Sequence, residues 1–254
     1  VLAYASDHNY TVLSHAEEKS LATGYYHYGY LTRDKGIPGI PSSSESVNVA
    51  RNMLLAGETG AKIHFCHLSA KESVALIKLG KELGINVTAE VTPHHLYFAD
   101  KDIIPFNTMY KVNPPIREIK DRDILRETLK SGLIDVIATD HAPHTQKEKE
   151  QRISEAPFGI SSIEIAASIV NTIFNDLQII YERMCRMPYK ILGEENSLSV
   201  GQIADLVVFD PEKEFEVTAE NWVSKGKNNP YFGKTLKGCV VLTIKGGKIV
   251  YEER

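Results

Sequence analysis

The hydrophobic pattern of the chain changes repeatedly from a strand type to a helical type. Short β-rich runs predict four strands, at residues 10–14, 62–66, 85–91 and 133–139. Apolar residues at helical spacing predict a helix after each strand, beginning near residue 43, at 70–83, at 121–130 and within 161–192. Strands that alternate with helices favour a parallel sheet covered by helices.

Two local signals predict the limits of these helices. Ser42 stands three residues before Glu45, which is the pattern of a capping box. We therefore expect these two side chains to hold the start of the first helix. Gly84 follows the second helical run and is a typical residue to end it.

This alternation leaves two α/β folds to consider. A TIM-type (β/α)8 barrel carries its chemistry at the carboxyl ends of its strands. An open doubly wound sheet would favour a glycine-rich phosphate loop, and neither GxGxxG nor GxxxxGK(S/T) occurs in the sequence. Because four strand–helix units are half of a closed barrel, we expect residues 1–198 to form one half of such a barrel.

From residue 199 the pattern changes to strands separated by turns. Strands are predicted at 206–210, 236–244 and 248–251, with two glycines between the last two. We expect residues 199–254 to form part of a small β domain, because about 55 residues bury little core of their own.

Composition and charge narrow the class of protein. The 254 residues are 43% hydrophobic and 24% charged, which is typical of a globular domain and not of a disordered chain. No apolar run approaches the roughly 18–20 residues of a membrane span. The net charge of −4 and the scattered basic residues argue against a nucleic-acid partner. The three cysteines form no CxxC pair, so we expect reduced thiols and a cytoplasmic location.

The histidines gather where the predicted strands end. His15 follows the first strand, His67 the second, His94 and His95 the third, and Asp140 the fourth. In a parallel barrel all these positions surround one mouth, so His15, His67 and Asp140 are expected to converge. Imidazole and carboxylate together suit a divalent transition metal, and zinc first.

The remaining histidines have simpler interpretations. His8 and His27 lie in loop sequence, where no ligand role is favoured. His64 lies inside a strand and is expected in the core or in support of a ligand. For His94 and His95, one is expected to reach the mouth, and the sequence does not say which.

Six motifs, in this order and at these separations, resemble the amidohydrolase superfamily and, within it, the bacterial-type (class I) dihydroorotases. They are 15–17 (HAE), 64–69 (HFCHLS), 92–96 (TPHHL), 111–117 (KVNPPIR), 138–144 (ATDHAPH) and 156–160 (APFGI). The resemblance extends over essentially the whole chain and includes the segment 228–238 (NNPYFGKTLKG). Each motif alone is weak, and the ordered set is specific.

The resemblance implies a zinc site with one or two metal ions in the complete protein. His15 and His67 resemble the two imidazole ligands of one zinc ion. Asp140 resembles the carboxylate that binds the other zinc and transfers the proton during catalysis.

The resemblance also implies where a small-molecule substrate binds. Asn113 and His144 resemble substrate contacts, and backbone groups of Pro157, Phe158 and Gly159 resemble a further contact. The charged segment 145–155 fits either a lid over this site or a plain solvated loop.

The activity that the resemblance implies is the reversible interconversion of N-carbamoyl-L-aspartate and L-dihydroorotate in pyrimidine biosynthesis. Asn113 favours this reaction, because enzymes that open hydantoin and allantoin resemble the same region but usually lack that residue. Two alternatives stay open: a hydantoinase or allantoinase, and a non-catalytic relative that scaffolds a partner. A homodimer or a complex with aspartate transcarbamoylase is the assembly expected.

The sequence departs from the family at its start. No His-x-His motif occurs, and the metal-bridging carboxylate of the fourth family strand has no counterpart. Residues 1–5 read like the last turn of a helix. We therefore expect this chain to be the C-terminal part of a longer enzyme, to bind at most one zinc weakly and to have no useful turnover alone.

Overall fold

The computed structural model describes residues 1–33, 35–194 and 197–253. The chain forms two compact units, which we describe one at a time. The first comprises Val1–Ser162 and Ser224–Pro230, and the second comprises Ile163–Val223 and Tyr231–Arg254. None of the helices among the described residues is both long enough and apolar enough to cross a membrane.

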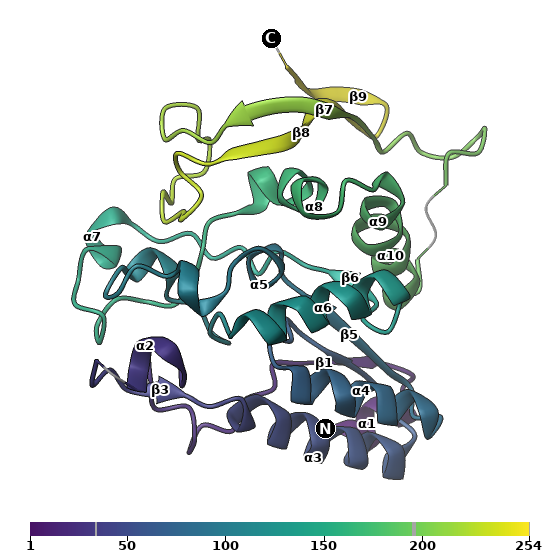
Figure 1. Cartoon of the computed structure of the whole chain (residues 1–254). Helices are drawn as coiled ribbons and strands as arrows, with labels where there is room; N and C mark the ends of the chain where they lie inside the picture. Colours follow the sequence, from purple (N-terminus) through teal and green to yellow (C-terminus); the bar gives the residue numbers. More distant parts are fainter. Residues whose placement is uncertain (34, 195–196, 254) are drawn as a thin grey trace. The chain divides into compact units, whose positions relative to one another are not determined.

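The first unit is built on a four-stranded parallel sheet in the order β1-β4-β5-β6 (Figure 1). Its strands are β1 (Thr11–Ser14), β4 (Lys62–Phe65), β5 (Val87–Val91) and β6 (Val136–Ile137). Ser14 pairs with Phe65, Phe65 with Ala89, and Val91 with Ile137, so the strands end at one edge of the sheet. The predicted parallel sheet is therefore confirmed.

The fourth strand is shorter than its sequence predicts. Residues 133–139 carry the strand pattern, but only Val136–Ile137 form a strand. The carboxylate of Asp135 accepts the Ala89 N–H at 2.9 Å and pairs with Lys81 at 2.9 Å. At the start of β6, the Asp135 carboxylate thus accepts the hydrogen bond that a backbone carbonyl would accept in a longer strand.

Helices follow the strands, as the periodicity predicts. They are α3 (Ser43–Thr59), α4 (Lys71–Glu82) and α6 (Ile119–Ser131), and one short helix, α1 (Leu2–Asp7), precedes the first strand. The core between α3, α4 and the sheet contains Val49, Met53, Phe65 and Ile77, all buried. At Gly80 of α4 an added Cβ would lie 2.4 Å from the Met53 sulfur, so a larger residue there would require the Met53 side chain to move.

The predicted capping box at the start of α3 is wrong. The Ser42 side chain makes no capping hydrogen bond. The carboxylate of Glu45 instead accepts hydrogen bonds from the Ser69 N–H and hydroxyl and, at 3.0 Å, from the Ala70 N–H. These donors are buried at the start of α4, where an unpaired amide is more costly than one at the exposed end of α3.

Several short elements lie in segments whose sequence predicts only loops. β2 (Tyr26–His27) and β3 (Gly39–Ile40) form a two-stranded parallel pair. The others are α2 (Tyr30–Arg33), α5 (Pro93–Tyr97), η1 (Asp100–Asp102), η2 (Thr108–Tyr110) and α7 (Gln146–Lys149). Helix α7 lies within the charged segment 145–155.

The second unit combines helices with an antiparallel sheet. The sheet consists of β7 (Leu206–Glu216), β8 (Thr235–Lys245) and β9 (Lys248–Glu252), in that order. These strands confirm the predicted β segment. The helical elements are η3 (Ile163–Ile165), α8 (Ala166–Phe174), α9 (Leu177–Tyr181), η4 (Glu182–Arg186) and α10 (Met187–Leu192). Asn171 of α8 donates to the Lys237 carbonyl of β8 at 2.9 Å. The domain boundary between residues 198 and 199 stays a prediction.

Candidate active site

Two imidazoles meet where β1 and β4 end. His15 follows Ser14 directly, and His67 lies two residues beyond Phe65. His15 Nδ1 and His67 Nε2 are 3.0 Å apart. Burial and the neighbouring His67 lower the pKa of His15, which favours the neutral imidazole whose ring nitrogen can bind a metal.

The distance between these nitrogens fits two ligands of one metal ion. Two nitrogens that each lie about 2.0–2.1 Å from a tetrahedral zinc are about 3.3 Å from one another. The other nitrogen of His67, Nδ1, is buried and has no hydrogen-bond partner among the described residues. The pair therefore fits as part of a metal site.

Asp140 lies near this pair but does not complete a ligand set. Its negative charge partly offsets the lowering of the His15 pKa by burial and His67. It also adds to burial and Glu90 in raising the pKa of Cys66, so it lies within electrostatic range of both. No group of three or more His, Cys, Asp or Glu side chains in the described part of the chain is arranged to hold a metal ion. The structure thus brings together two of the three predicted ligands and leaves Asp140, an exposed side chain, beside them.

The backbone at two of these positions adopts the left-handed region. His67 has a φ of 37° and Asp140 a φ of 45°, which non-glycine residues seldom adopt. Glu90 of β5 supports His67 by accepting its N–H at 3.2 Å. The other oxygen of Glu90 lies 3.0 Å from His64 Nε2, so His64 is buried and supports the turn, as its place in a strand predicts.

A second carboxylate connects the imidazole pair to Asn113. Glu17 Oε1 accepts a hydrogen bond from Asn113 Nδ2 at 2.6 Å. Glu17 Oε2 lies 3.7 Å from His15 Nε2. We assigned no role to Glu17 from the sequence, although its position two residues after His15 indicates that it lies near that imidazole.

Buried ionic contacts hold the loops that carry His67 and Asn113. Arg117 donates to Ser69 Oγ at 2.9 Å and to the Ile40 carbonyl at 3.1 Å, and it pairs with Glu45 at 3.7 Å. Burial and the charge of Arg117 lower the pKa of His27 to about 3, so His27 is a neutral partner of Arg117.

His94 and His95 are both buried, at 1% and 3% exposure. His95 Nε2 donates to the Pro114 carbonyl at 3.0 Å. The two nitrogens of His94 have no hydrogen-bond partner among the residues that the structure describes. Burial lowers the pKa of His94, and it lowers that of His95 to about 3. Both rings are buried, and the expectation that one of them reaches the mouth stays a prediction.

His144 and the segment 157–159 form one hydrogen-bonded group. His144 Nε2 donates to the Phe158 carbonyl at 2.9 Å. Asn228 accepts the His144 N–H at 2.8 Å and donates to the carbonyls of Ala142, at 2.9 Å, and Gly159, at 3.0 Å. Gly159 has a φ of 141°, and a Cβ there would lie 2.6 Å from the Ala142 Cβ, so only glycine fits. The family resemblance included Asn228 in the segment 228–238 but assigned it no role.

Two buried lysines contact the same segment. Lys149 Nζ donates to the Pro157 carbonyl at 2.9 Å and to the Gly159 carbonyl at 3.1 Å. Lys111 Nζ donates to the carbonyls of Ile153 and Ala156. In the sequence, Lys149 stands in a charged run and is indistinguishable from solvated lysines.

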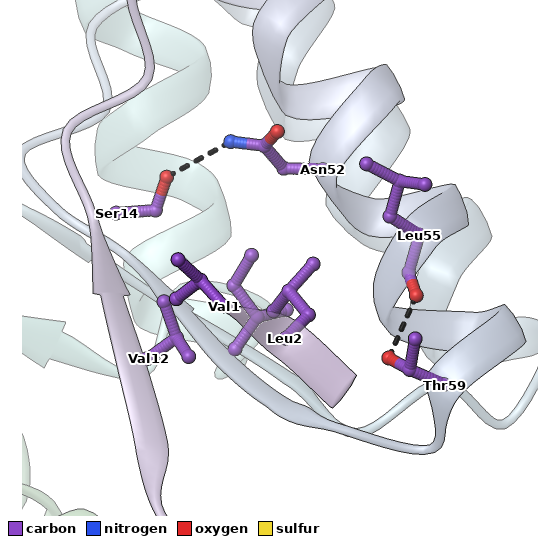
Figure 2. A pocket seen from close by; sticks show the side chains of 8 residues that line it. Val1, Leu2, Val12, Ser14, Asn52, Leu55 and Thr59 are labelled. Atoms are coloured by element: carbon purple, nitrogen blue, oxygen red, sulfur yellow. Dashed lines mark hydrogen bonds between the residues drawn. The ribbon is translucent and has the colours of Figure 1, made fainter. Parts of the chain in front are cut away.

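A cavity of about 380 Å³ lies apart from these groups. Figure 2 shows the apolar side chains of α1, β1 and α3 around it. Its lining consists of Val1, Leu2, Val12, Ser14, Asn52, Leu55, Thr59 and Ile63. Because the lining has no imidazole or carboxylate, this cavity lacks the chemistry of the candidate site.

Curated relatives of the chain are dihydroorotases. That of Caldanaerobacter subterraneus is 44% identical over the whole of this chain and 60% of its own length. That of Bacillus subtilis is 43% identical over 95% of this chain and 58% of its own length. The chain therefore spans about three fifths of the length of these relatives.

Similar solved structures carry hydantoinase and dihydropyrimidinase names. A dihydropyrimidinase from Brevibacillus agri matches with a TM-score of 0.86 at 23% identity, over 99% of this chain and 59% of its own. An L-hydantoinase from Arthrobacter aurescens matches with a TM-score of 0.85 at 27% identity, over 99% of this chain and 58% of its own. These likenesses confirm the predicted fold, of which this chain carries one part. The family match over residues 1–250 shows that the chain belongs to the amidohydrolase family, as its motifs predicted.

Proposed function

We propose that this chain forms part of a metal-dependent hydrolase of cyclic amides that interconverts L-dihydroorotate and N-carbamoyl-L-aspartate. The observation that carries the proposal is the 3.0 Å approach of His15 Nδ1 to His67 Nε2 at the edge where the parallel strands end. The dihydroorotase names of relatives at 42–44% identity support this choice of substrate.

His15 and His67 would hold a divalent metal ion, zinc first, with Asp140 beside them. One or two ions would occupy the complete site. When bound, such an ion supplies Lewis acidity, which polarises an amide carbonyl and lowers the pKa of water to about 7. Glu17 lies 3.7 Å from the far nitrogen of His15 and would orient that ring.

Asp140 is proposed to move the proton during ring opening. Its carboxylate would take a proton from the attacking water as the new C–O bond forms. It would then deliver the proton to the ring nitrogen as the C–N bond breaks, because an amide nitrogen is a poor leaving group until it is protonated. The exposed position of Asp140 next to His15 suits this transfer.

Asn113, His144 and the backbone at 157–159 are proposed to bind the substrate. The Asn113 amide and the His144 ring are hydrogen-bond donors that suit carboxylate oxygens. The hydrogen bonds of Asn113 to Glu17 and of His144 to Phe158 hold both side chains in place, and the Asn113 amide keeps its second N–H for the substrate.

The test is turnover by the protein as its gene encodes it. We expect interconversion of dihydroorotate and N-carbamoyl-aspartate that a chelator removes and zinc restores. Asp140→Ala should lower kcat by about 10²–10⁴-fold. Its circular dichroism should stay unchanged, because Asp140 makes no hydrogen bond or ion pair with the described residues. Asp7→Ala, at another exposed aspartate, should leave kcat unchanged. Activity that survives Asp140→Ala would remove the proton-transfer assignment.

The same protein preparation also tests the two alternative functions, a hydantoinase or allantoinase and a non-catalytic scaffold. Hydantoin and allantoin serve as competing substrates, because the similar solved structures include hydantoinases. A protein that opens neither ring and not dihydroorotate would be the non-catalytic scaffold. The 254 residues alone are predicted to have no useful turnover, and a normal rate from them would contradict this.

The assembly and location of the protein are further parts of the proposal. A homodimer or a complex with an aspartate transcarbamoylase is proposed, and light scattering with and without that enzyme distinguishes the two. The three cysteines are free, which supports a location in the cytoplasm.

A further inference from the structure

The segment 153–159 is held by two buried cations. Lys149 is 1% exposed and Lys111 is 2% exposed. Their ammonium groups donate to four backbone carbonyls of this segment and pair with no carboxylate among the described residues. A buried charge without a counter-charge is costly to retain. Burial and the charge of Lys111 lower the pKa of Lys149 to about 8, in keeping with this cost.

Helix α7 is fixed so that Lys149 reaches the segment. At its start, Thr145 Oγ1 accepts the Glu148 N–H and the Glu148 carboxylate accepts the Thr145 N–H at 2.8 Å. At its end, the Lys149 carbonyl accepts a hydrogen bond from the Thr108 hydroxyl. Hydrogen bonds at both ends of this single helical turn therefore fix the position of Lys149.

One backbone N–H of residues 157–159 has no acceptor among the described residues and is available to a ligand. Pro157 has no N–H, and the Gly159 N–H donates to the Lys111 carbonyl at 2.8 Å. The Phe158 N–H donates to no acceptor in the part of the chain that the structure describes. This N–H belongs to the peptide group whose carbonyl, that of Pro157, accepts from Lys149. A cation on the carbonyl polarises the peptide and makes its N–H a stronger donor.

We propose that Lys149 is a positioning residue, which holds the Pro157 and Gly159 carbonyls so that the Phe158 N–H is fixed and polarised for an oxygen of the anionic substrate. This inference rests on the proposed function, since it takes the segment 157–159 as a substrate contact. It adds a residue on a separate helix, which acts through the backbone and does not touch the substrate.

The test compares three variants of the protein as its gene encodes it. Lys149→Met removes the charge and the donors, Lys149→Arg keeps both, and Lys147→Met is the matched control. Lys147 lies on the same helix, is exposed, and makes no side-chain hydrogen bond or ion pair with the described residues. The measurements are KM and kcat for dihydroorotate, and hydrogen exchange at the Gly159 amide, whose N–H donates to the Lys111 carbonyl and whose own carbonyl accepts from Lys149.

Lys149→Met is expected to raise KM about tenfold and to leave kcat within about twofold, because the lost contact serves binding before and during the reaction alike. Exchange at the hydrogen-bonded Gly159 amide should become about tenfold faster, because the segment opens more often without Lys149. Lys149→Arg should recover at least half of the KM change on a logarithmic scale, and Lys147→Met should match the wild type.

The proposal is overturned if Lys149→Met keeps both the wild-type KM and the wild-type exchange rate. Should Lys149→Met fail to fold, Lys149→Arg decides: a KM within about threefold of wild type supports the proposal and a tenfold rise overturns it. A wild-type protein without turnover would refute the proposed function. Exchange at the Gly159 amide would then still decide whether Lys149 holds this segment.

Discussion

The segments 42–45 and 145–148 carry the same Ser/Thr-x-x-Glu pattern and use it in opposite ways. In 145–148, the side chains of Thr145 and Glu148 bond reciprocally to each other's backbone and begin α7. In 42–45, the Ser42 hydroxyl caps nothing. The Glu45 carboxylate binds the backbone of residues 69 and 70 instead.

The difference shows that the surroundings decide what such a pattern does. Glu45 is 3% exposed, lies 3.7 Å from Arg117, and accepts from the buried Ser69 and Ala70 amides, for which the described residues offer no other acceptor. Glu148 is on the surface, where no buried donor competes for its carboxylate. A buried unpaired amide costs more than a frayed helix end, so Glu45 serves the core.

Both segments nonetheless support the candidate site. Glu45 holds Ser69, two residues after His67. Thr145 and Glu148 begin the helical turn that carries Lys149 to Gly159. Substitutions in the two segments are therefore expected to lower the free energy of unfolding by different amounts.

The largest loss is expected for Glu45→Ala. It leaves Arg117 buried without its counter-charge and leaves the buried Ser69 and Ala70 donors unpaired. The free energy of unfolding should fall by about 3–5 kcal/mol, measured by urea unfolding. Glu58→Ala, at an exposed position on the same helix, is the control and should change it by less than about 0.5 kcal/mol. A loss for Glu45→Ala no larger than that of the control would contradict the assigned role.

The fold followed from local patterns that survive in the structure. Period-two and helical spacing placed the four strands and their helices, and strand ends placed His15 beside His67. Alternation of apolar residues depends only on neighbours in the chain, so it can be read without the tertiary structure.

The supporting residues could not be read in this way. Asn228 bonds to His144, 84 residues away in the sequence, and Lys149 is buried within a run of charged residues. Their roles depend on partners that only the folded chain brings near. Glu45 misled for the same reason, since its true partners lie 24 and 25 residues further on.

The second-largest effect concerns Lys149, which follows the segment 145–148, and the pH dependence of the free energy of unfolding. The pKa of Lys149 is lowered to about 8, so the folded protein holds fewer protons than the unfolded chain between pH 8 and about 10.5. The wild type should therefore gain stability relative to Lys149→Met as the pH rises through this window, by about 2 kcal/mol from pH 8 to pH 10. The comparison cancels other titrating groups. A constant difference across this range, measured by urea unfolding, would mean that Lys149 keeps an ordinary pKa.

A smaller loss is expected for Thr145→Ala. The substitution removes the hydroxyl that accepts the Glu148 N–H and should lower the free energy of unfolding by about 1 kcal/mol, the usual value for an N-cap. Faster hydrogen exchange confined to α7 and residues 157–159 would show that the cap acts through Lys149. Exchange at the wild-type rate in residues 157–159 would show that the Thr145 cap does not stabilise that segment.

The smallest effect is expected for Ser42→Ala, although its pattern is the same. Ser42 has φ −60° and ψ −29°, a helical conformation, whereas a capping residue has an extended one. Its carbonyl, not its hydroxyl, accepts the N–H groups of Glu45 and Ser46 at 3.1 Å, and alanine keeps that carbonyl. The free energy of unfolding should thus change by less than about 0.3 kcal/mol. If Ser42→Ala costs as much as Thr145→Ala in the same urea series, the hydroxyl caps α3 in solution, and the two segments use their shared pattern alike.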